Sequence, residues 1–234
     1  MDILEIKDVH KSFDDKKIID SVSFNVKQGK IVGLLGKNGS GKTTIIKMIN
    51  DLLTMGSGEI LVNGEKISEK TKAMISYLPE RTYLDPAKTV AQVFNMFEDF
   101  YADFNREKAE KLLKDLDLDI NASLSKMSKG MKEKIQLVLV MSRQAKLYIL
   151  DEPLGGVDPS TRDYILQTIL SNFGEDASML ITTHLIADVE KILDDVIFID
   201  KGKIILNESA DELRTKEKTS INEIFRRVVK WLKI

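Results

Sequence analysis

The chain has 234 residues, of which 43% are hydrophobic and 31% are charged, so it can bury a sizeable core but is short for two domains. Its net charge of -2 provides no basic surface of the kind that binds nucleic acid, and we expect no nucleic-acid partner. The lack of cysteine excludes disulfides, thiolate metal sites and cysteine nucleophiles.

No segment of the sequence is expected to enter a membrane. Residues 1–6 are acidic and alternate in polarity, unlike a signal peptide. The longest apolar runs, such as 135–141 with Gln136 inside it, are far shorter than the roughly 20 residues that cross a bilayer. If the protein acts at a membrane, we expect another chain to supply the span.

The N-terminal part of the chain is predicted to be rich in strands. Residues 3–9 and 18–26 alternate between apolar and polar side chains, as half-buried strands do. Residues 30–35 form a continuous apolar run, typical of a strand buried on both faces of a sheet. A helix is predicted after the glycine-rich stretch that follows, and Asn63-Gly64 between apolar residues predicts a hairpin.

The middle of the chain changes to helical periodicity. Apolar residues at helical spacing mark one helix over 90–104 and a second over 109–116, with Asn105 as the expected cap between them. A further helix is predicted at about 131–144. These helices form an all-helical insert in an otherwise α/β pattern.

The C-terminal part returns to alternating strands and helices. Strand patterns occur at 147–150, 179–182 and 195–199, with helical patterns between them, which predicts a mostly parallel sheet. The tail, 220–234, has apolar residues along one side of a helix. This helix is expected to pack on the core, contact a second subunit or lie on a membrane surface.

A glycine-rich stretch directly after the apolar strand 30–35 matches the pattern G-x-x-x-x-G-K-[ST]. Glycines let backbone N–H groups turn inward around phosphate oxygens, and the following helix points its positive end at the anion. Lys42 would bridge the β- and γ-phosphates of ATP, and Thr43 would offer its hydroxyl to Mg²⁺. A chance glycine-rich turn is disfavoured by the strand before the motif and the helix after it. The residues predicted to bind ATP here are Gly36, Lys37, Asn38, Gly39, Ser40, Gly41, Lys42, Thr43 and Thr44.

Two acidic residues, Asp151 and Glu152, end the apolar strand at 147–150. Ligands bind at the carboxyl ends of strands in open α/β sheets, so these carboxylates are expected to face the nucleotide. Asp151 would hold Mg²⁺, directly or through water, and Glu152 would polarise a water for in-line attack on the γ-phosphate. Such a pair in isolation is commonly a pair of surface acids, but the phosphate loop favours the functional interpretation.

Five further segments occur in order around these motifs. They are Phe13, residues 77–80 (Tyr-Leu-Pro-Glu), residues 127–131 (Met-Ser-Lys-Gly-Met), residues 153–158 (Pro-Leu-Gly-Gly-Val-Asp) and residues 180–184 (Leu-Ile-Thr-Thr-His). The arrangement resembles the ATP-binding subunit of ABC transporters and covers nearly the whole chain. Their order is far more specific than any one of them.

The resemblance implies an α/β fold with a P-loop NTPase core and a mostly parallel sheet. An N-terminal antiparallel β subdomain and an inserted all-helical subdomain would complete a single ATP-binding domain, residues 1–234. We expect the core to span 1–88 and 141–210, the helical subdomain 89–140 and the C-terminal helical tail 211–234.

The resemblance also implies a role for each matched residue. Phe13 would stack on adenine, His184 would contact the γ-phosphate and hold the attacking water, and Glu152 would be the catalytic base. Ser128 and Gly130 belong to the family signature, usually Leu-Ser-Gly-Gly-Gln, and would touch the γ-phosphate bound to a second subunit.

Four positions depart from the family pattern or lie between subunits. Lys129 and Met131 replace the first Gly and the Gln of the signature, while the two phosphate-contacting positions remain. Glu80 stands where the family usually has Gln; it keeps an oxygen for Mg²⁺ but makes it a charged one. Asp158 would lie in the loop that communicates between two subunits.

The leading hypothesis is a motor in which ATP binding closes a head-to-tail homodimer or heterodimer and hydrolysis reopens it. A transmembrane permease on a separate chain would hold it at the cytoplasmic face of the cell membrane. Residues 79–80 and 128–131 look most like bacterial exporters of drugs, lipids or antimicrobial peptides. The alternatives are an ABC-type ATPase of DNA repair or translation, and a P-loop kinase or GTPase.

Overall fold

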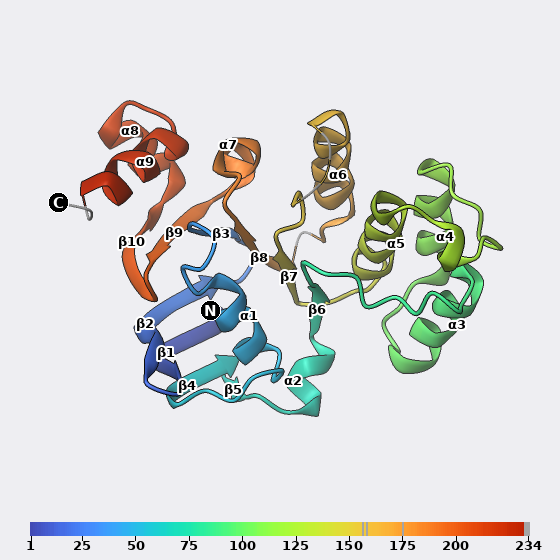
Figure 1. Cartoon of the computed structure of the whole chain (residues 1–234), viewed down its shortest axis with the longest axis horizontal. Helices are drawn as coiled ribbons and strands as arrows, with labels where there is room; N and C mark the ends of the chain where they lie inside the picture. Colours follow the sequence, from blue (N-terminus) through green and yellow to red (C-terminus); the bar gives the residue numbers. More distant parts are fainter. Residues whose placement is uncertain (156, 158, 175, 232–234) are drawn as a thin grey trace.

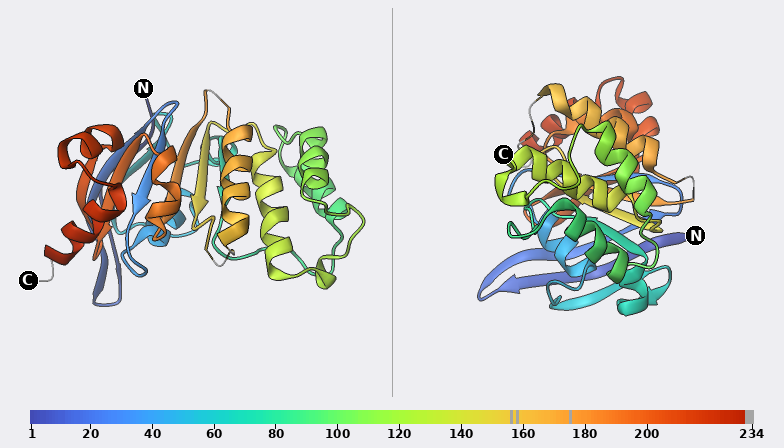
Figure 2. Two further views of the ribbon diagram at one scale, coloured as in Figure 1. Left: turned by 90° about the horizontal axis from the view of Figure 1, so that it is seen from above. Right: turned by 90° about the vertical axis from the view of Figure 1, so that its right-hand side faces the viewer.

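The structure is a computed structural model that describes residues 1–155, 157, 159–174 and 176–231. It is a mixed α/β protein with two sheets near its centre and helices at both ends (Figure 1). Figure 2 shows α3, α4 and α5 at one end of the molecule and α8 and α9 at the other. Asp158, which was assigned to a contact between subunits, lies outside the described residues.

An antiparallel sheet is built by the N-terminal strands in the order β2-β1-β4-β5. The sequence predicts two of these strands and the hairpin, whose turn places Asn63 and Gly64 at positive φ. Alternation along the strands puts one set of side chains into the core and the other into solvent. The strands are β1 (Asp2–Phe13), β2 (Lys16–Lys27), β4 (Ser57–Val62) and β5 (Glu65–Lys66).

The second sheet is mostly parallel, as predicted, with the order β10-β9-β3-β8-β7-β6. Its central strands β3, β7 and β8 are buried along their whole length, which explains the apolar runs 31–35, 147–150 and 179–181 within them. Among the described strands of this sheet, β10 is the single one that runs antiparallel to its neighbour. The strands are β3 (Ile31–Leu35), β6 (Ile75–Leu78), β7 (Leu147–Asp151), β8 (Ser178–Thr183), β9 (Asp195–Asp200) and β10 (Lys203–Ser209).

Helix α1 (Lys42–Ile49) lies between the two sheets. Its residues Ile45, Ile46 and Ile49 are fully buried in one apolar cluster with side chains of both sheets. The helix begins at the end of the phosphate loop, so packing of its apolar side fixes the direction in which its N-terminus points.

The predicted helical insert consists of α3 (Val90–Phe100), α4 (Arg106–Asp115) and α5 (Lys129–Met141). Asn105 caps α4 as expected, with its side chain accepting from the N–H of Lys108 at 2.9 Å. Ser128 caps α5, which begins and ends about two to three residues earlier than predicted. The short helix α2 (Glu69–Ala73) precedes this segment.

Buried Arg143, just after α5, joins the helical insert to the parallel sheet. Its guanidinium donates to both carboxylate oxygens of Asp103, at 2.9 and 3.1 Å. It also donates to the carbonyls of Ile75 and Ala73, each at 2.6 Å, and lies 3.9 Å from the ring centre of Tyr101. Five donors in a rigid fork allow one arginine to make all these contacts.

The C-terminal tail forms α8 (Ala210–Glu217) and α9 (Ile221–Trp231), which follow α6 (Pro159–Asn172) and α7 (Ile186–Val189). The apolar side of α9 packs on the parallel sheet, where Phe225 meets Phe198 edge-to-face at 5.1 Å. Of the three uses expected for this helix, the structure shows packing on the core. No helix in the described part of the chain is long and apolar enough to cross a bilayer.

Candidate nucleotide site

The phosphate loop connects β3 to α1, as the motif requires. A Cβ on Gly36 would lie 2.6 Å from the carbonyl oxygen of Ile199, so the loop can pass this strand only with glycine here. Gly41 precedes α1 with φ of 112°, a backbone conformation that residues with a Cβ atom rarely adopt. The backbone of the loop is therefore held in the tight turn that a phosphate cradle needs.

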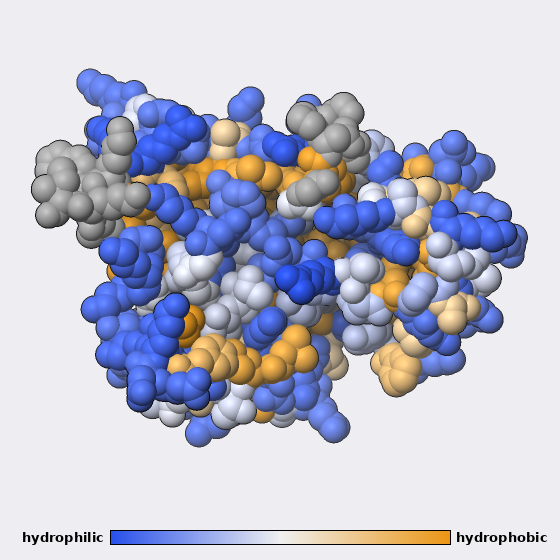
Figure 3. Space-filling view, viewed as in Figure 1, coloured by the Kyte–Doolittle hydropathy of each residue, from blue (hydrophilic) through white to orange (hydrophobic). Residues whose placement is uncertain are grey.

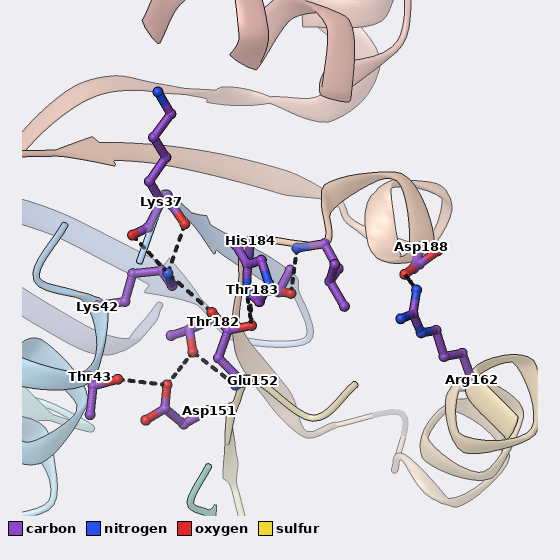
Figure 4. A network of polar contacts seen from close by, with 12 residues as sticks. Lys37, Lys42, Thr43, Asp151, Glu152, Arg162, Thr182, Thr183, His184 and Asp188 are labelled. Carbon is purple, nitrogen blue, oxygen red and sulfur yellow. Dashed lines mark hydrogen bonds and ion pairs between the residues drawn. The ribbon is translucent and has the colours of Figure 1, made fainter. Parts of the chain in front are cut away.

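Lys42 folds back over the loop it ends. Its Nζ donates to the carbonyl of Gly36 at 2.7 Å and to that of Lys37 at 3.3 Å (Figure 4). The same Nζ lies 3.1 Å from Oε1 of Glu152, and both side chains are less than a tenth exposed. The lysine and the acid thus form a buried ion pair across the site.

Asp151 lies on the opposite side of this pair, next to α1. Its Oδ1 accepts hydrogen bonds from Thr43 Oγ1 at 3.3 Å and from Thr182 Oγ1 at 2.5 Å. Burial raises the pKa of Asp151, while the bonds from Thr182 and Thr43 lower it. Asp151 forms no ion pair with any described residue, so no cationic side chain among those residues compensates its charge.

Glu152 is positioned by β8 as well as by its own strand. Its backbone has φ of 52°, and its N–H donates to the carbonyl of Thr182 at 2.9 Å. Its Oε2 accepts from His184 through the backbone N–H at 3.3 Å and lies 2.9 Å from Nδ1 of the ring. The carboxylate is therefore shared between the phosphate-loop lysine and the histidine (Figure 4).

The nucleotide pocket is an open hollow of about 500 Å³ over the loop, within the range of ordinary ligand sites. Phe13 stands at its edge, 47% exposed, where a base could stack on it. Glu80 reaches the same pocket from the segment after β6. The pocket is lined by Phe13, Lys16, Ile18, Asn38, Gly39, Gly41, Lys42, Thr43, Thr44, Glu80 and Glu152.

Two residues of the predicted site lie elsewhere. Ser128 and Gly130 stand at the exposed N-terminus of α5, and neither lines the nucleotide pocket. The Ser128 side chain accepts from the N–H of Met131 at 3.2 Å, and a Cβ on Gly130 would meet nothing within 4 Å. One chain therefore does not bring the signature segment to its own phosphate loop.

Sequence reasoning did not assign a role to Thr182, which bonds Asp151 and the N–H of Glu152. The only signal was a threonine at the end of an apolar strand, and its contact with β7 depends on strand order. Lys16 and Ile18, which line the pocket beside Phe13, carry no motif at all.

A largely apolar groove separates α3 from β6 and α2, and Arg143 is one of the residues that line it. We call it the α3–β6 groove. Phe100 at the end of α3 is 77% exposed and Tyr83 is 47% exposed, and both line it. Figure 3 shows apolar surface at the lower end of α3. The groove is lined by Lys47, Asn50, Leu52, Lys72, Ile75, Ser76, Tyr77, Pro79, Arg81, Tyr83, Met96, Phe97, Phe100, Tyr101, Val140 and Arg143.

Comparison with known proteins identifies the family that shares these features. Residues 19–155 match the ABC transporter family. The ATP-binding protein YtrB of Bacillus subtilis (strain 168) is 31% identical over 215 residues, covering 91% of this chain and 74% of YtrB. The Nod factor export ATP-binding protein I of Rhizobium etli is 28% identical, covering 88% of this chain and 67% of that protein.

Comparison with solved structures supports the same family assignment. A structure of the ATP-binding subunit of an ABC transporter superposes with a TM-score of 0.87 at 27% identity, covering 97% of this chain and 99% of that one. The chain therefore belongs to the ABC transporter family, as one of its ATP-binding subunits. Members of this family bind and hydrolyse ATP and work with transmembrane subunits, which favours the transporter hypothesis over a kinase, a GTPase or a soluble ABC-type ATPase.

Proposed function

We propose that this subunit powers an exporter, and that Lys42, Glu152 and His184 carry out ATP hydrolysis. The observation that carries the proposal is that all three side chains meet at one point above the phosphate loop. When ATP binds, Lys42 exchanges Glu152 for the β- and γ-phosphates. Glu152 then accepts a proton from the attacking water, which His184 orients, as the water oxygen bonds phosphorus and ADP leaves.

Magnesium fits the residues on the α1 side of the site. Mg²⁺ is commonly held by one or two carboxylates together with substrate phosphates, and the described residues form no cluster of three or more acids and histidines. Asp151 supplies a buried carboxylate without a partner cation, and Thr43 a hydroxyl 3.3 Å from it. Glu80 supplies a further oxygen at the pocket. A bound Mg²⁺ would neutralise charge that develops on the phosphate oxygens.

Dimerisation is the second part of the proposal. Ser128 and Gly130 are exposed and remote from the pocket of their own chain. In a head-to-tail dimer the N–H groups at the start of α5 would face the γ-phosphate bound by the partner, where the helix dipole favours an anion. Two sites would then lie in the interface, and hydrolysis would remove the charge that holds them closed.

A permease on a separate chain is the partner that the α3–β6 groove would receive, at the cytoplasmic face of the membrane. Contiguous exposed apolar surface marks interaction sites, and the exposed Phe100 and Tyr83 both line this one largely apolar groove. Export is supported by the family resemblance of residues 79–80 and 128–131, and by the name of the Nod factor export relative. Drugs, lipids or peptides are the proposed cargo.

The decisive experiment uses Glu152→Gln. The variant should bind ATP without hydrolysing it, and light scattering should then show a dimer that dissociates when ATP is replaced by ADP. An ATP-loaded variant that stays monomeric would contradict head-to-tail closure. Affinity purification from native membranes should recover an integral membrane protein with the wild-type chain, and its loss in Phe100→Ala would place it at the groove.

A further inference from the structure

A small cavity, which we call the α5 cavity, lies between α5 and the two acids at the end of β7. Its volume is about 30 Å³, room for two or three waters, since a water needs roughly 10–15 Å³ measured this way. It is a separate space from the nucleotide pocket, although Glu80 and Glu152 border both. It is lined by Leu78, Pro79, Glu80, Glu133, Gln136, Leu137, Asp151, Glu152, Pro153, Gly155 and Ile165.

Two polar atoms of residues at this cavity are buried with neither a hydrogen bond nor an ion pair to any described residue; a third, Glu152 Oε1, lacks a hydrogen bond but is paired with Lys42 Nζ at 3.1 Å. One is Nε2 of Gln136, a donor on a side chain that is 2% exposed. The other is Oδ2 of Asp151, an acceptor on a residue that is 1% exposed. Leaving either unpaired would cost stability, so buried groups of this kind normally have a protein or water partner. Here a buried donor and a buried acceptor belong to residues that line one small cavity.

We propose that Gln136 is a positioning residue for Asp151, acting through a water held in the α5 cavity. The water accepts a hydrogen bond from Gln136 Nε2 and donates one to Asp151 Oδ2. The other oxygen of Asp151 already accepts from Thr43 and Thr182, so the link fixes the carboxylate on both sides. This inference rests on the proposed role of Asp151 in holding Mg²⁺.

The position of Gln136 along α5 determines which parts of the protein the water link would connect. Ser128 begins the helix eight residues earlier, about 12 Å away at the rise of an α-helix. The other end of α5 is fixed to the core, because Ser76 Oγ donates to the carbonyl of Val140 at 2.9 Å and Arg143 donates to the carbonyl of Ile75 in β6. Gln136 thus ties the helix that carries the signature to the carboxylate of the metal site. ATP turnover would depend on α5 being seated against β7.

The test compares Gln136→Met with Ser142→Ala in the full chain. Methionine keeps the volume of glutamine and removes the donor. Ser142 is the matched control, since its buried hydroxyl at the end of α5 also lacks a partner among the described residues but does not line the cavity. Turnover number, KM for ATP, dependence on Mg²⁺ concentration and melting temperature are measured for each.

We expect Gln136→Met to lower kcat about tenfold, as losing a hydrogen bond of about 1.4 kcal/mol to a charged group would do. It should raise the Mg²⁺ concentration for half-maximal rate, keep KM for ATP within about twofold and leave the melting temperature unchanged or higher, because an apolar isostere removes a buried donor at little cost. Gln136→Asn, which keeps the amide, should recover part of kcat. Ser142→Ala should match the wild type.

Unchanged kcat in Gln136→Met, or an equal loss in Ser142→Ala, would overturn the proposal. So would a high-resolution crystal structure in which Gln136 Nε2 bonds protein atoms and no water reaches Asp151. That structure also decides the question if Gln136→Met does not fold. Glu152→Gln separates the two levels of inference: if it retains turnover, the proposed catalytic roles fail, whereas an inactive Glu152→Gln beside an unaffected Gln136→Met rejects the water link alone.

Discussion

Lys42 and Glu152 form an ion pair, with Nζ 3.1 Å from Oε1 in a buried site. The residue proposed to bind phosphate is therefore held by the residue proposed to activate water. ATP must displace one member of the pair, and the negative charge of Glu152 opposes the arrival of the triphosphate. Binding and catalysis thus make opposite demands on the same carboxylate.

Glu152→Gln should consequently bind ATP more tightly while losing activity. A unit charge about 4 Å from another contributes up to about 4 kcal/mol at an effective dielectric of 20, so we expect the Kd for ATP to fall at least about tenfold after screening. Removal of a general base should lower turnover by about 10²–10⁴-fold. Calorimetric titration and single-turnover hydrolysis measure the two effects.

Glu98→Gln is the charge-matched control for this variant, because Glu98 is an exposed partner of Arg106 far from the pocket in sequence and structure. It should change neither quantity. Weaker ATP binding in Glu152→Gln would mean that the carboxylate helps to hold the nucleotide, and the competition between Lys42 and phosphate would have to be abandoned.

The parts of the site that the sequence predicts are those carried by contiguous segments. The phosphate loop follows one buried strand and begins a helix, and Asp151 and Glu152 come at the end of another buried strand. Both parts of the site can therefore be recognised from the local sequence pattern. The Lys42–Glu152 pair and the Thr182–Asp151 bond join segments far apart in the chain. Their existence depends on β7, β8 and β3 being neighbours, which periodicity alone does not determine.

The strands of the fold likewise divide into those that the local sequence pattern predicts and those that it does not. The buried strands β3, β7 and β8, each built around an apolar run, are predicted to within one residue at each end. The edge strand β10 is missed because none of its residues is fully buried and its pattern is mixed, and β6 is missed because four residues are too few for a period. Ser128 and Gly130 follow from family resemblance, and no local pattern predicts where their partner phosphate lies.

Gly130→Ala should separate folding from dimer function. A Cβ here meets nothing within 4 Å in the chain, and alanine in place of glycine in a helix stabilises by about 0.5–1 kcal/mol. We expect a raised melting temperature, unchanged ATP affinity in the monomer and loss of turnover and of the ATP-dependent dimer. Gly36→Ala is the contrasting variant, since its Cβ would lie 2.6 Å from the Ile199 carbonyl and should abolish ATP binding. Full activity of Gly130→Ala would argue against a close phosphate approach at the signature.

Phe13→Ala should weaken ATP and GTP equally. Stacking of a base on an aromatic ring is worth about 1–3 kcal/mol and tolerates any base, so the Kd for each nucleotide should rise about tenfold, with Lys42 contacts intact. Tyr83→Ala is matched to it, because both rings are 47% exposed but Tyr83 lines the α3–β6 groove. It should leave nucleotide Kd values unchanged and weaken recovery of the membrane partner. A larger loss for ATP than for GTP in Phe13→Ala would point to base-specific hydrogen bonds instead of stacking.

Arg143→Met should destabilise the joint between the helical insert and the sheet. The guanidinium is 4% exposed, and its removal leaves Asp103 and the carbonyls of Ile75 and Ala73 without their donor. Breaking a buried pair from one side costs about 3–5 kcal/mol, so the free energy of unfolding measured in urea should fall by that amount. Arg143→Lys should recover little, because an ammonium cannot reproduce the planar fork.

Arg106→Met is the comparison for that loss. Arg106 also bonds two carboxylates, those of Glu110 at 2.7 Å and Glu98 at 3.4 Å, but it does so at the surface of the helical insert. Exposed pairs contribute about 0–1 kcal/mol, so this variant should unfold at nearly the wild-type urea concentration. Equal destabilisation by the two variants would show that the stability of the insert comes from its surface ion pairs. Destabilisation by Arg143→Met alone would show that the stability of the insert comes from the joint between the insert and the sheet. Through this joint, α5 and its signature residues are tied to the nucleotide site.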